Sequence, residues 1–193
     1  MTLKKGEITK QKIIEASAEI FNQKGYAGTS IDDIIKATGL KQGGIYRHFS
    51  SKEDIAKACF QYSSNVMNKR LTESVVNCKT AKEELFTTLD EFVFIAKSPS
   101  LKGGCPILNT SIDCDDTNED IKELVKNAVN RWKLLISGIL SKGILTGEFK
   151  KDIDIEEFTT VFIAAIEGSI FLSKLYDDVN YTAQVVNHLK KQF

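Results

Sequence analysis

Apolar and polar positions follow a helical period along most of this 193-residue chain. Between residues 119 and 142, apolar side chains recur every three or four positions from Ile121 through Trp132 to Leu140, which predicts an amphipathic helix. Comparable stripes predict helices over residues 10–24, 52–77, 80–96, 107–114, 155–176 and 182–193. No segment shows the strict alternation that is typical of a strand, so the pattern predicts an all-α protein.

Two further predicted helices are short and close together, over residues 31–37 and 42–48. The turn between them contains Gly39, which can adopt the left-handed conformation that a tight turn needs. Ser30 can cap the first of these helices, with Asp33 as its capping-box partner. This layout is that of a helix-turn-helix, whose second helix enters the major groove of DNA. With these two short helices, the sequence predicts about nine helices in total.

The outward face of the second short helix is predicted to carry Gln42, Gly43, Gly44 and Arg47, because Ile45 points to the core. Glycine in a helix costs about 1 kcal/mol relative to alanine. A short helix with two glycines therefore indicates a backbone that must come close to another molecule, such as a DNA edge or a phosphate.

The residues around this unit form a recognisable motif. They are Thr29, Ile34, Thr38-Gly39, Gly43, Tyr46, Phe49 and Lys52-Glu53, preceded by the helix of residues 12–21 and by Gly25-Tyr26. With them the segment resembles the DNA-binding domain of TetR/AcrR-type bacterial transcriptional regulators. The resemblance implies a homeodomain-like three-helix domain over residues 6–66, with the helix-turn-helix at 29–48. It also implies a helical effector-binding and dimerisation domain over residues 67–193.

Candidate DNA contacts lie on and beside the second short helix. Lys41, Gln42, Gly43 and Arg47 are candidates near base edges, with Gly44 beside them. Thr29, Ser30, Tyr46, His48 and Lys52 are candidates for phosphates. Two alternatives stay open: Lys41 and Arg47 contact phosphates only, and Tyr46 and His48 pack against the preceding helices.

The predicted helix over residues 155–176 is apolar on nearly all sides, so it must be covered all round. The cover is either the rest of this chain or a second copy, and the resemblance implies that the last two helices form a homodimer. The candidate interface residues are Phe158, Phe162, Gly168, Ser169, Phe171, Leu172, Val185 and Leu189.

A small-molecule pocket is implied by the resemblance, among the helices between residues 82 and 171. The candidate lining residues are Phe92, Ile95, Cys105, Leu108, Ile112, Trp132, Ile136 and Phe162, and for each of them the alternative is an ordinary core residue, which their apolar pattern favours. Because they are mostly apolar, we expect a hydrophobic or aromatic effector. Cys105 stands at a helix start near Lys102, where a thiol pKa falls, so an alternative is a thiol- or electrophile-sensing repressor.

Charge is distributed unevenly, although the net charge is zero. Residues 1–52 carry nine Lys/Arg and five Asp/Glu, a net charge of +4, and the rest of the chain has a net charge of −4. A basic N-terminal part suits contact with phosphates. The longest apolar run is interrupted by Glu167 and the N-terminus is polar, so we expect a cytoplasmic protein with no membrane partner.

Enzymes and metalloproteins are disfavoured by the motifs. Phosphate-loop, dinucleotide-binding, zinc-protease and nucleophile-elbow patterns do not occur, and the only histidines are His48 and His188. The four cysteines form no C-x-x-C pair. We therefore expect no catalytic residues, metal or cofactor. The expected partners are a palindromic double-stranded operator, a second copy of the chain and a small effector. The remaining alternative is a helical interaction module that does not bind DNA.

Overall fold

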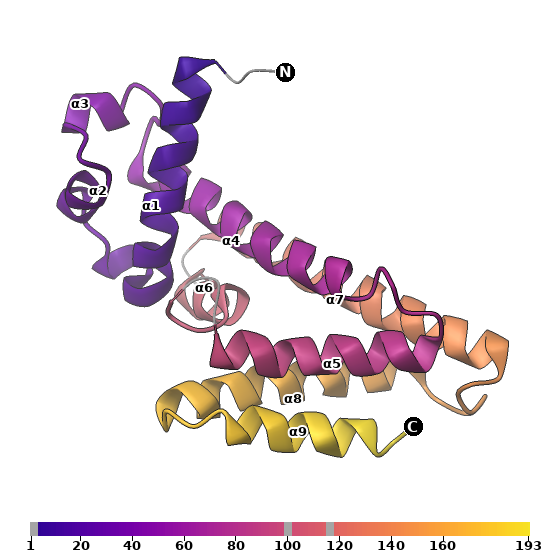
Figure 1. Ribbon diagram of the computed structural model, residues 1–193. Coiled ribbons are helices and arrows are strands. Elements are labelled where there is room, and N and C mark those ends of the chain that lie inside the picture. Colours follow the sequence, from indigo (N-terminus) through magenta and orange to yellow (C-terminus); the bar gives the residue numbers. More distant parts are fainter. Residues whose placement is uncertain (1–3, 99–101, 115–117) are drawn as a thin grey trace. The chain divides into compact units, whose positions relative to one another are not determined.

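The computed structural model describes residues 4–98, 102–114 and 118–193, and within them the chain forms nine helices and no strand (Figure 1). In chain order they are α1 (Lys5–Gly28), α2 (Ile31–Thr38), α3 (Gln42–Ile45), α4 (Lys52–Ser74), α5 (Ala81–Lys97), α6 (Pro106–Cys114), α7 (Glu119–Thr146), α8 (Ile155–Leu175) and α9 (Asn180–Lys190). The predicted all-α class is confirmed for the described residues.

The chain divides into two compact units. The first unit comprises residues 1–65 together with 101–126, and the second comprises residues 66–100 together with 127–193. The division falls within α4 and within α7. Residues 101–126 thus cluster with the N-terminal helices, although they follow α5 in the chain.

Four isoleucines, Ile13, Ile34, Ile45 and Ile55, form the centre of the first unit, and each is completely buried. They come from α1, α2, α3 and α4 respectively, so each of these helices contributes its apolar face to one core. Burying an aliphatic side chain of this size stabilises the folded state by about 1.5–3 kcal/mol. The core therefore fixes the short α3, which is too short to be stable alone.

The core of the second unit is aromatic at its centre. Phe92 of α5 contacts Trp132 of α7 and Phe162 of α8 edge to face, with ring centroids 5.1 and 5.9 Å apart. All three side chains are buried. Helix α8 also packs along α9, where the hydroxyl groups of Ser173 and Thr182 lie 2.8 Å apart.

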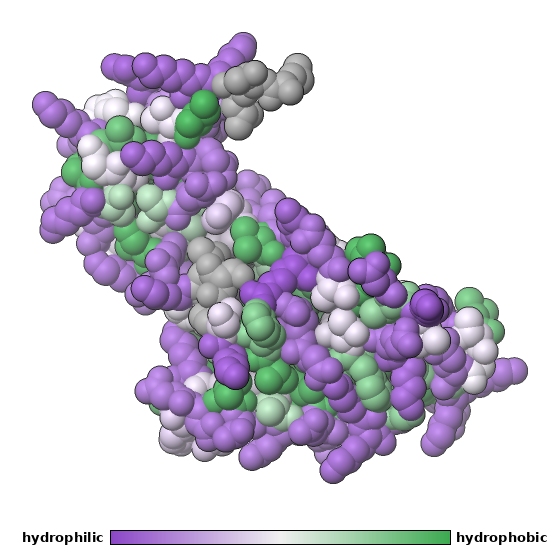
Figure 2. All heavy atoms as spheres, in the orientation of Figure 1, coloured by the Kyte–Doolittle hydropathy of each residue, from purple (hydrophilic) through white to green (hydrophobic). Residues whose placement is uncertain are grey.

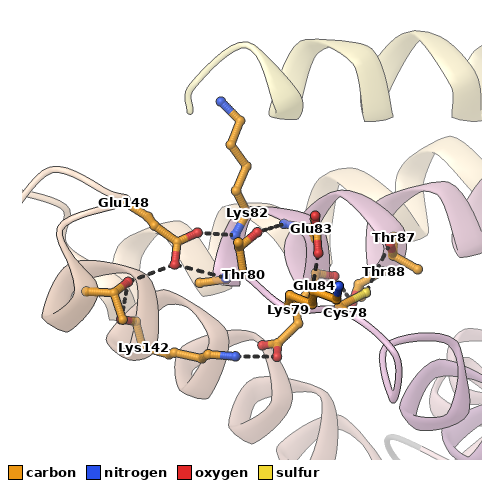
Figure 3. Close-up of polar contacts among 12 residues, drawn as sticks. Cys78, Lys79, Thr80, Lys82, Glu83, Glu84, Thr87, Thr88, Lys142 and Glu148 are labelled. Carbon is orange, nitrogen blue, oxygen red and sulfur yellow. Dashed lines mark hydrogen bonds and ion pairs between the residues drawn. The ribbon is translucent and has the colours of Figure 1, made fainter.

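The start of α5 is tied to the loop that follows α7, as Figure 3 shows. Thr80 caps α5 by accepting a hydrogen bond from the Glu83 amide at 3.1 Å. The Glu148 carboxylate accepts a second bond from the Lys82 amide at 3.0 Å, and Lys142 forms an ion pair with Glu84 at 2.6 Å. The contacts of Thr80 and Glu148 satisfy amide groups that a helix N-terminus leaves without an internal partner.

Helix bounds differ from the predicted ones mainly at the ends. The first helix begins earlier, at Lys5, and Gly25 interrupts it with a φ of 71°, which is where the sequence predicted its end. Helix α3 is shorter than predicted, since residues 46–48 form a turn. Helix α7 continues to Thr146, four residues beyond the predicted end at 142.

By length and composition alone, α8 could cross a membrane, and it is the one such helix in the described part of the chain. A single helix of this kind is weak support for a membrane span, because core helices have the same composition. Here α8 packs against α5 and α9 of its own chain. Even so, only 33% of its most apolar stretch is buried within the chain.

Candidate nucleic-acid interface

The helix-turn-helix is built by local contacts at the ends of α2. The Ser30 side chain accepts a hydrogen bond from the Asp33 amide at 3.1 Å, and the Asp33 carboxylate accepts one from the Ser30 amide at 3.0 Å. This confirms the predicted capping box. At the other end Gly39 has a φ of 69°, as the turn requires, and its amide donates to the carbonyl of Ile35.

The Asp33 carboxylate has a second partner, because the Lys24 ammonium lies 2.7 Å from it. The hydrogen bond from Lys24, together with those from Ser30, holds the pKa of Asp33 well below its usual range. The charge of Asp33 is thus paired within the chain, which limits its repulsion of a nearby phosphate.

Polar residues and glycine make up the exposed surface of α3. Lys41, Gln42, Gly43 and Arg47 are exposed, and Tyr46 is 38% exposed, whereas Ile45 is fully buried. The predicted division of this helix into an inward and an outward face is therefore present. Figure 2 shows hydrophilic side chains over much of the visible surface of the first unit.

Gly43 has no explanation within the chain. A Cβ atom added there would meet no atom within 4 Å, and the φ of Gly43 is not positive. At Gly44 the nearest atom would be the Cβ of Leu40, at an ordinary 3.7 Å. Neither steric crowding nor backbone conformation requires glycine at these two positions, so the fold of this chain does not explain them.

Two of the candidate phosphate contacts, Thr29 and Lys52, have partners inside the chain. Thr29 is 1% exposed and its hydroxyl donates to the carbonyl of Gly25 at 2.7 Å. The Lys52 ammonium donates to the carbonyls of Tyr26 and Thr29 at 2.8 and 3.0 Å, and lies 4.2 Å from the Tyr26 ring centroid. Both side chains therefore hold the segment between α1 and α2.

The start of α1 lies beside the turn that follows α3, which sequence reasoning did not anticipate. A Cβ atom at Gly6 would be 3.9 Å from Cε1 of His48, and the Lys10 ammonium lies 5.3 Å from the Phe49 ring centroid. Lys10 entered the sequence argument only as part of the basic N-terminal charge. Its position depends on how α1 packs on α3, which no local pattern specifies.

The predicted dimer residues of α8 and α9 fall into two groups. Phe162, Ser169 and Leu189 are buried within this chain, so they belong to its own core. Phe158, Leu172 and Val185 are half-buried, and Gly168 and Phe171 are exposed. The exposed positions continue along one side of α8, which carries Val161, Ala164, Gly168, Phe171 and Leu175 at helical spacing.

The predicted effector residues are distributed over both units. In the second unit Phe92, Ile95, Trp132, Ile136 and Phe162 are all buried core. In the first unit Cys105 is buried, Leu108 is half-buried, and Ile112 is exposed. A pocket formed by these eight residues stays a prediction.

Known proteins match this chain along its whole length. Residues 13–59 match the family described as bacterial regulatory proteins of the tetR family, and residues 81–189 match the tetracyclin repressor-like C-terminal domain. The chain belongs to the TetR family. It is accordingly a DNA-binding transcriptional regulator and not an enzyme. Regulators of this family act as dimers with small-molecule effectors.

Individual TetR-family relatives support this assignment. A TetR transcriptional regulator from Chloroflexus aurantiacus has a TM-score of 0.94 and 36% identity, covering 98% of this chain and 96% of that one. One from Cytophaga hutchinsonii has a TM-score of 0.91 and 35% identity, covering 100% and 96%. The fatty acid metabolism regulator protein of Bacillus subtilis is 25% identical over 160 residues, which is 82% of this chain and 80% of the relative.

The two alternatives considered from the sequence are not favoured by these matches. A helical module without DNA binding is opposed by the match of the helix-turn-helix itself. Thiol sensing through Cys105 is further opposed by burial, since the residue is only 2% exposed. No metal-binding cluster of His, Cys, Asp or Glu occurs among the residues that the structure describes.

Proposed function

We propose that this TetR-family regulator binds a palindromic operator as a homodimer and that a small-molecule effector releases it. In this proposal residues 6–66 contact DNA, and residues 67–193 provide dimerisation and effector binding. The soluble regulators to which the chain is similar support a cytoplasmic location.

The observation that carries the DNA contact is the exposed, glycine-containing surface of α3. Helix-turn-helix dimers place two such helices about 34–36 Å apart, one turn of B-DNA. Gln42 has the amide that can pair with adenine, and Lys41 and Arg47 have donors that suit guanine or phosphate. Ser30, Tyr46 and His48 are proposed phosphate contacts, with Lys10 added because it neighbours the turn that follows α3. Thr29 and Lys52 are proposed to shape this surface from within.

The proposed dimer face is the exposed apolar side of α8 together with the adjoining part of α9. A groove between these two helices is lined by residues that include Phe158, Val161, Val185 and His188. Contiguous exposed apolar surface of this kind is uncommon on a protein that stays monomeric. At Gly168 an added Cβ would meet no atom of this chain, so the glycine leaves room for a second backbone.

An electrophoretic mobility shift with DNA from the region upstream of the protein's own coding sequence tests the proposal. We expect salt-sensitive binding of two chains per operator, since phosphate contacts release counterions. Binding that is absent at every salt concentration on this and on randomised DNA would contradict the proposal. Sedimentation of the free protein supplies the second test, for which we expect a dimer.

A further inference from the structure

The first unit contains a cavity of about 470 Å³ that is lined by α1, α4, α6 and the first turn of α7. Its apolar wall includes Phe21, Phe60, Pro106 and Ile121. Pockets that hold drug-sized molecules have volumes of about 300–1,000 Å³. None of the eight predicted effector residues is among the described residues that line this cavity.

The charges around this cavity are mainly negative. Glu53 and Asp113 line it, and no Lys or Arg does so among the described residues. The nearby Lys57 ammonium lies 2.8 Å from Glu53 and 2.7 Å from Asp120, so one cation is shared between two carboxylates. The hydrogen bond from Lys57 lowers the pKa of Glu53.

We propose that this cavity binds a small aromatic organic cation. The rings of the ligand lie against the apolar wall formed by Phe21 and Phe60, and its positive charge faces Glu53 and Asp113. Aromatic side chains provide large apolar contact areas and also attract cations through their ring faces. An anion of the same size is rejected, because the two carboxylates repel it and none of the described lining residues is a Lys or Arg that would compensate.

Hydrogen bonds within the first unit hold the shape of this site. The Asn22 amide of α1 donates to the carbonyls of Lys102 and Gly104 at 2.8 and 3.0 Å, and its oxygen accepts from Asn109 of α6 at 2.9 Å. Asn22 thus joins α1 to α6 and to the residues that precede α6, and so fixes this part of the cavity wall. Asp113 accepts a hydrogen bond from the Tyr26 amide at 3.0 Å, which fixes the position of one carboxylate. A site held in this way loses little freedom when it binds a ligand.

The same cavity contacts the core of the helix-turn-helix. Ala18 and Cys59 line it and also belong to the cluster that contains Ile34 and Ile45. Burial raises the pKa of the Cys59 thiol to about 12, as expected for an apolar wall. A ligand that prefers one arrangement of this core changes DNA affinity, and DNA changes ligand affinity by the same factor. The effect on DNA affinity rests on the proposed function, whereas ligand binding itself does not.

Fluorescence titration of the full-length protein with thioflavin T tests the proposal. This aromatic cation becomes fluorescent when its rings are immobilised. Its uncharged demethylated analogue and the anion anilinonaphthalene sulfonate serve as probes of similar size and different charge. We expect saturable binding of one thioflavin T per chain, about tenfold weaker binding of the uncharged analogue, and no saturable binding of the anion at this site.

A variant inside the cavity and an exposed control locate the site. Thr110 of α6 lines the cavity, so Thr110→Phe should fill it and weaken thioflavin T binding by about tenfold or more. Leu134 of α7 is exposed and does not line the cavity, so Leu134→Phe should leave binding unchanged. Glu53→Gln should remove the preference for the cation over its uncharged analogue, while Glu123→Gln on α7 should keep it. Thermal unfolding of each variant verifies that it is folded.

Equal affinity for cation and anion would overturn the proposal, as would unchanged binding in a folded Thr110→Phe protein. If Thr110→Phe does not fold, the Glu53→Gln comparison decides alone, since retained cation preference there would refute the assigned charge contacts. A mobility shift without any probe is measured in parallel. If the protein binds thioflavin T as expected but does not bind DNA, only the proposed function is contradicted. If it binds DNA but does not bind thioflavin T, only this site is contradicted.

Discussion

Helices α3 and α8 both expose surface that the chain itself leaves uncovered, but the two surfaces differ in chemistry. On α3 the apolar residue Ile45 is buried and the exposed positions are polar or glycine. On α8 the exposed positions include Val161, Phe171 and Leu175, all of them large and apolar. The first surface is suited to a hydrated, charged partner such as DNA, and the second to an apolar partner such as another copy of α8.

Placing a charge on the exposed side of α8 should have the largest effect on this comparison. Phe171→Glu leaves the monomer intact, because Phe171 is 52% exposed there, but it buries an unpaired carboxylate in a dimer. We expect a loss of at least about 3 kcal/mol in dimer free energy. Sedimentation should show monomers, and operator affinity should fall because the dimer is lost.

The matched control for Phe171→Glu is Leu145→Glu at the end of α7, where the side chain is 86% exposed. This control should remain dimeric. If Phe171→Glu also remains a dimer at the same concentrations, the apolar side of α8 is not the interface.

Truncating the buried core under α3 should have the next largest effect. Ile34→Ala removes a completely buried side chain and should lower the free energy of unfolding of the first unit by about 2–5 kcal/mol. Ile8→Ala in α1 is the control, since Ile8 is 54% exposed and should change stability by no more than about 0.5 kcal/mol. Urea unfolding measures both. Equal effects would mean that the apolar residues of the helix-turn-helix are not packed as described.

Removing an exposed cation from the α3 surface should weaken operator binding without unfolding the protein. Arg47→Ala should cost about 1–3 kcal/mol of affinity if the guanidinium contacts a base, and should relax specificity at one position. If it contacts only phosphate, the loss should be similar on every sequence. Fluorescence anisotropy with operator and random DNA separates the two results. Lys133→Ala on α7 is the control, and an equal loss there would contradict the assignment.

Substituting Gly39 and Gly43 of the helix-turn-helix should give opposite effects on stability. Gly43→Ala should raise helix stability by up to about 1 kcal/mol, because Gly43 has helical geometry and open space around it. It should nevertheless weaken operator binding, since the added methyl group occupies the proposed contact. Gly39→Ala should be destabilising, because its φ of 69° strains any other residue. Full operator affinity in Gly43→Ala would remove the main physical reason for the proposed contact.

The smallest expected effect is on the pH dependence of stability, which depends on the Asp33 carboxylate at the start of α2. The pKa of Asp33 is lower in the folded protein than in the unfolded chain, so its stabilising effect is present at neutral pH. That stabilisation is lost as the pH falls below the ordinary carboxyl pKa of about 4 toward the folded value. Asp33→Asn should therefore lower stability at pH near 7 and much less in acid. Urea unfolding at neutral and at acid pH measures both losses, and equal losses at the two would contradict this account.

Local features of this fold could be predicted from sequence, whereas long-range contacts could not. The capping box of Ser30 and the left-handed Gly39 depend on residues within a few positions, and both predictions are confirmed. The contact between Asn22 and Asn109 joins residues 87 positions apart, and no pattern near either one indicates it. The cavity beside them was missed for the same reason, since its wall is formed only when α6 packs on α1.

The predicted dimer residues show a second limit of sequence reasoning. Helix α8 is apolar on nearly all sides, so its pattern does not distinguish the side that meets its own chain from the side left exposed. Phe162 and Ser169 were assigned to an interface together with Phe171, although only Phe171 is exposed. On α3, where polar and apolar positions are clearly separated, the outward face could be assigned in advance.

Changing the spacing of the operator tests the central claim most directly, namely that two copies of α3 read one duplex together. Inserting about 5 base pairs between the two half-sites turns one of them to the opposite side of the DNA, since one turn takes 10–10.5 base pairs. We predict that a mobility shift loses cooperative binding with this insertion and regains part of it when a full turn is inserted. Affinity that is the same for all three spacings would contradict the claim.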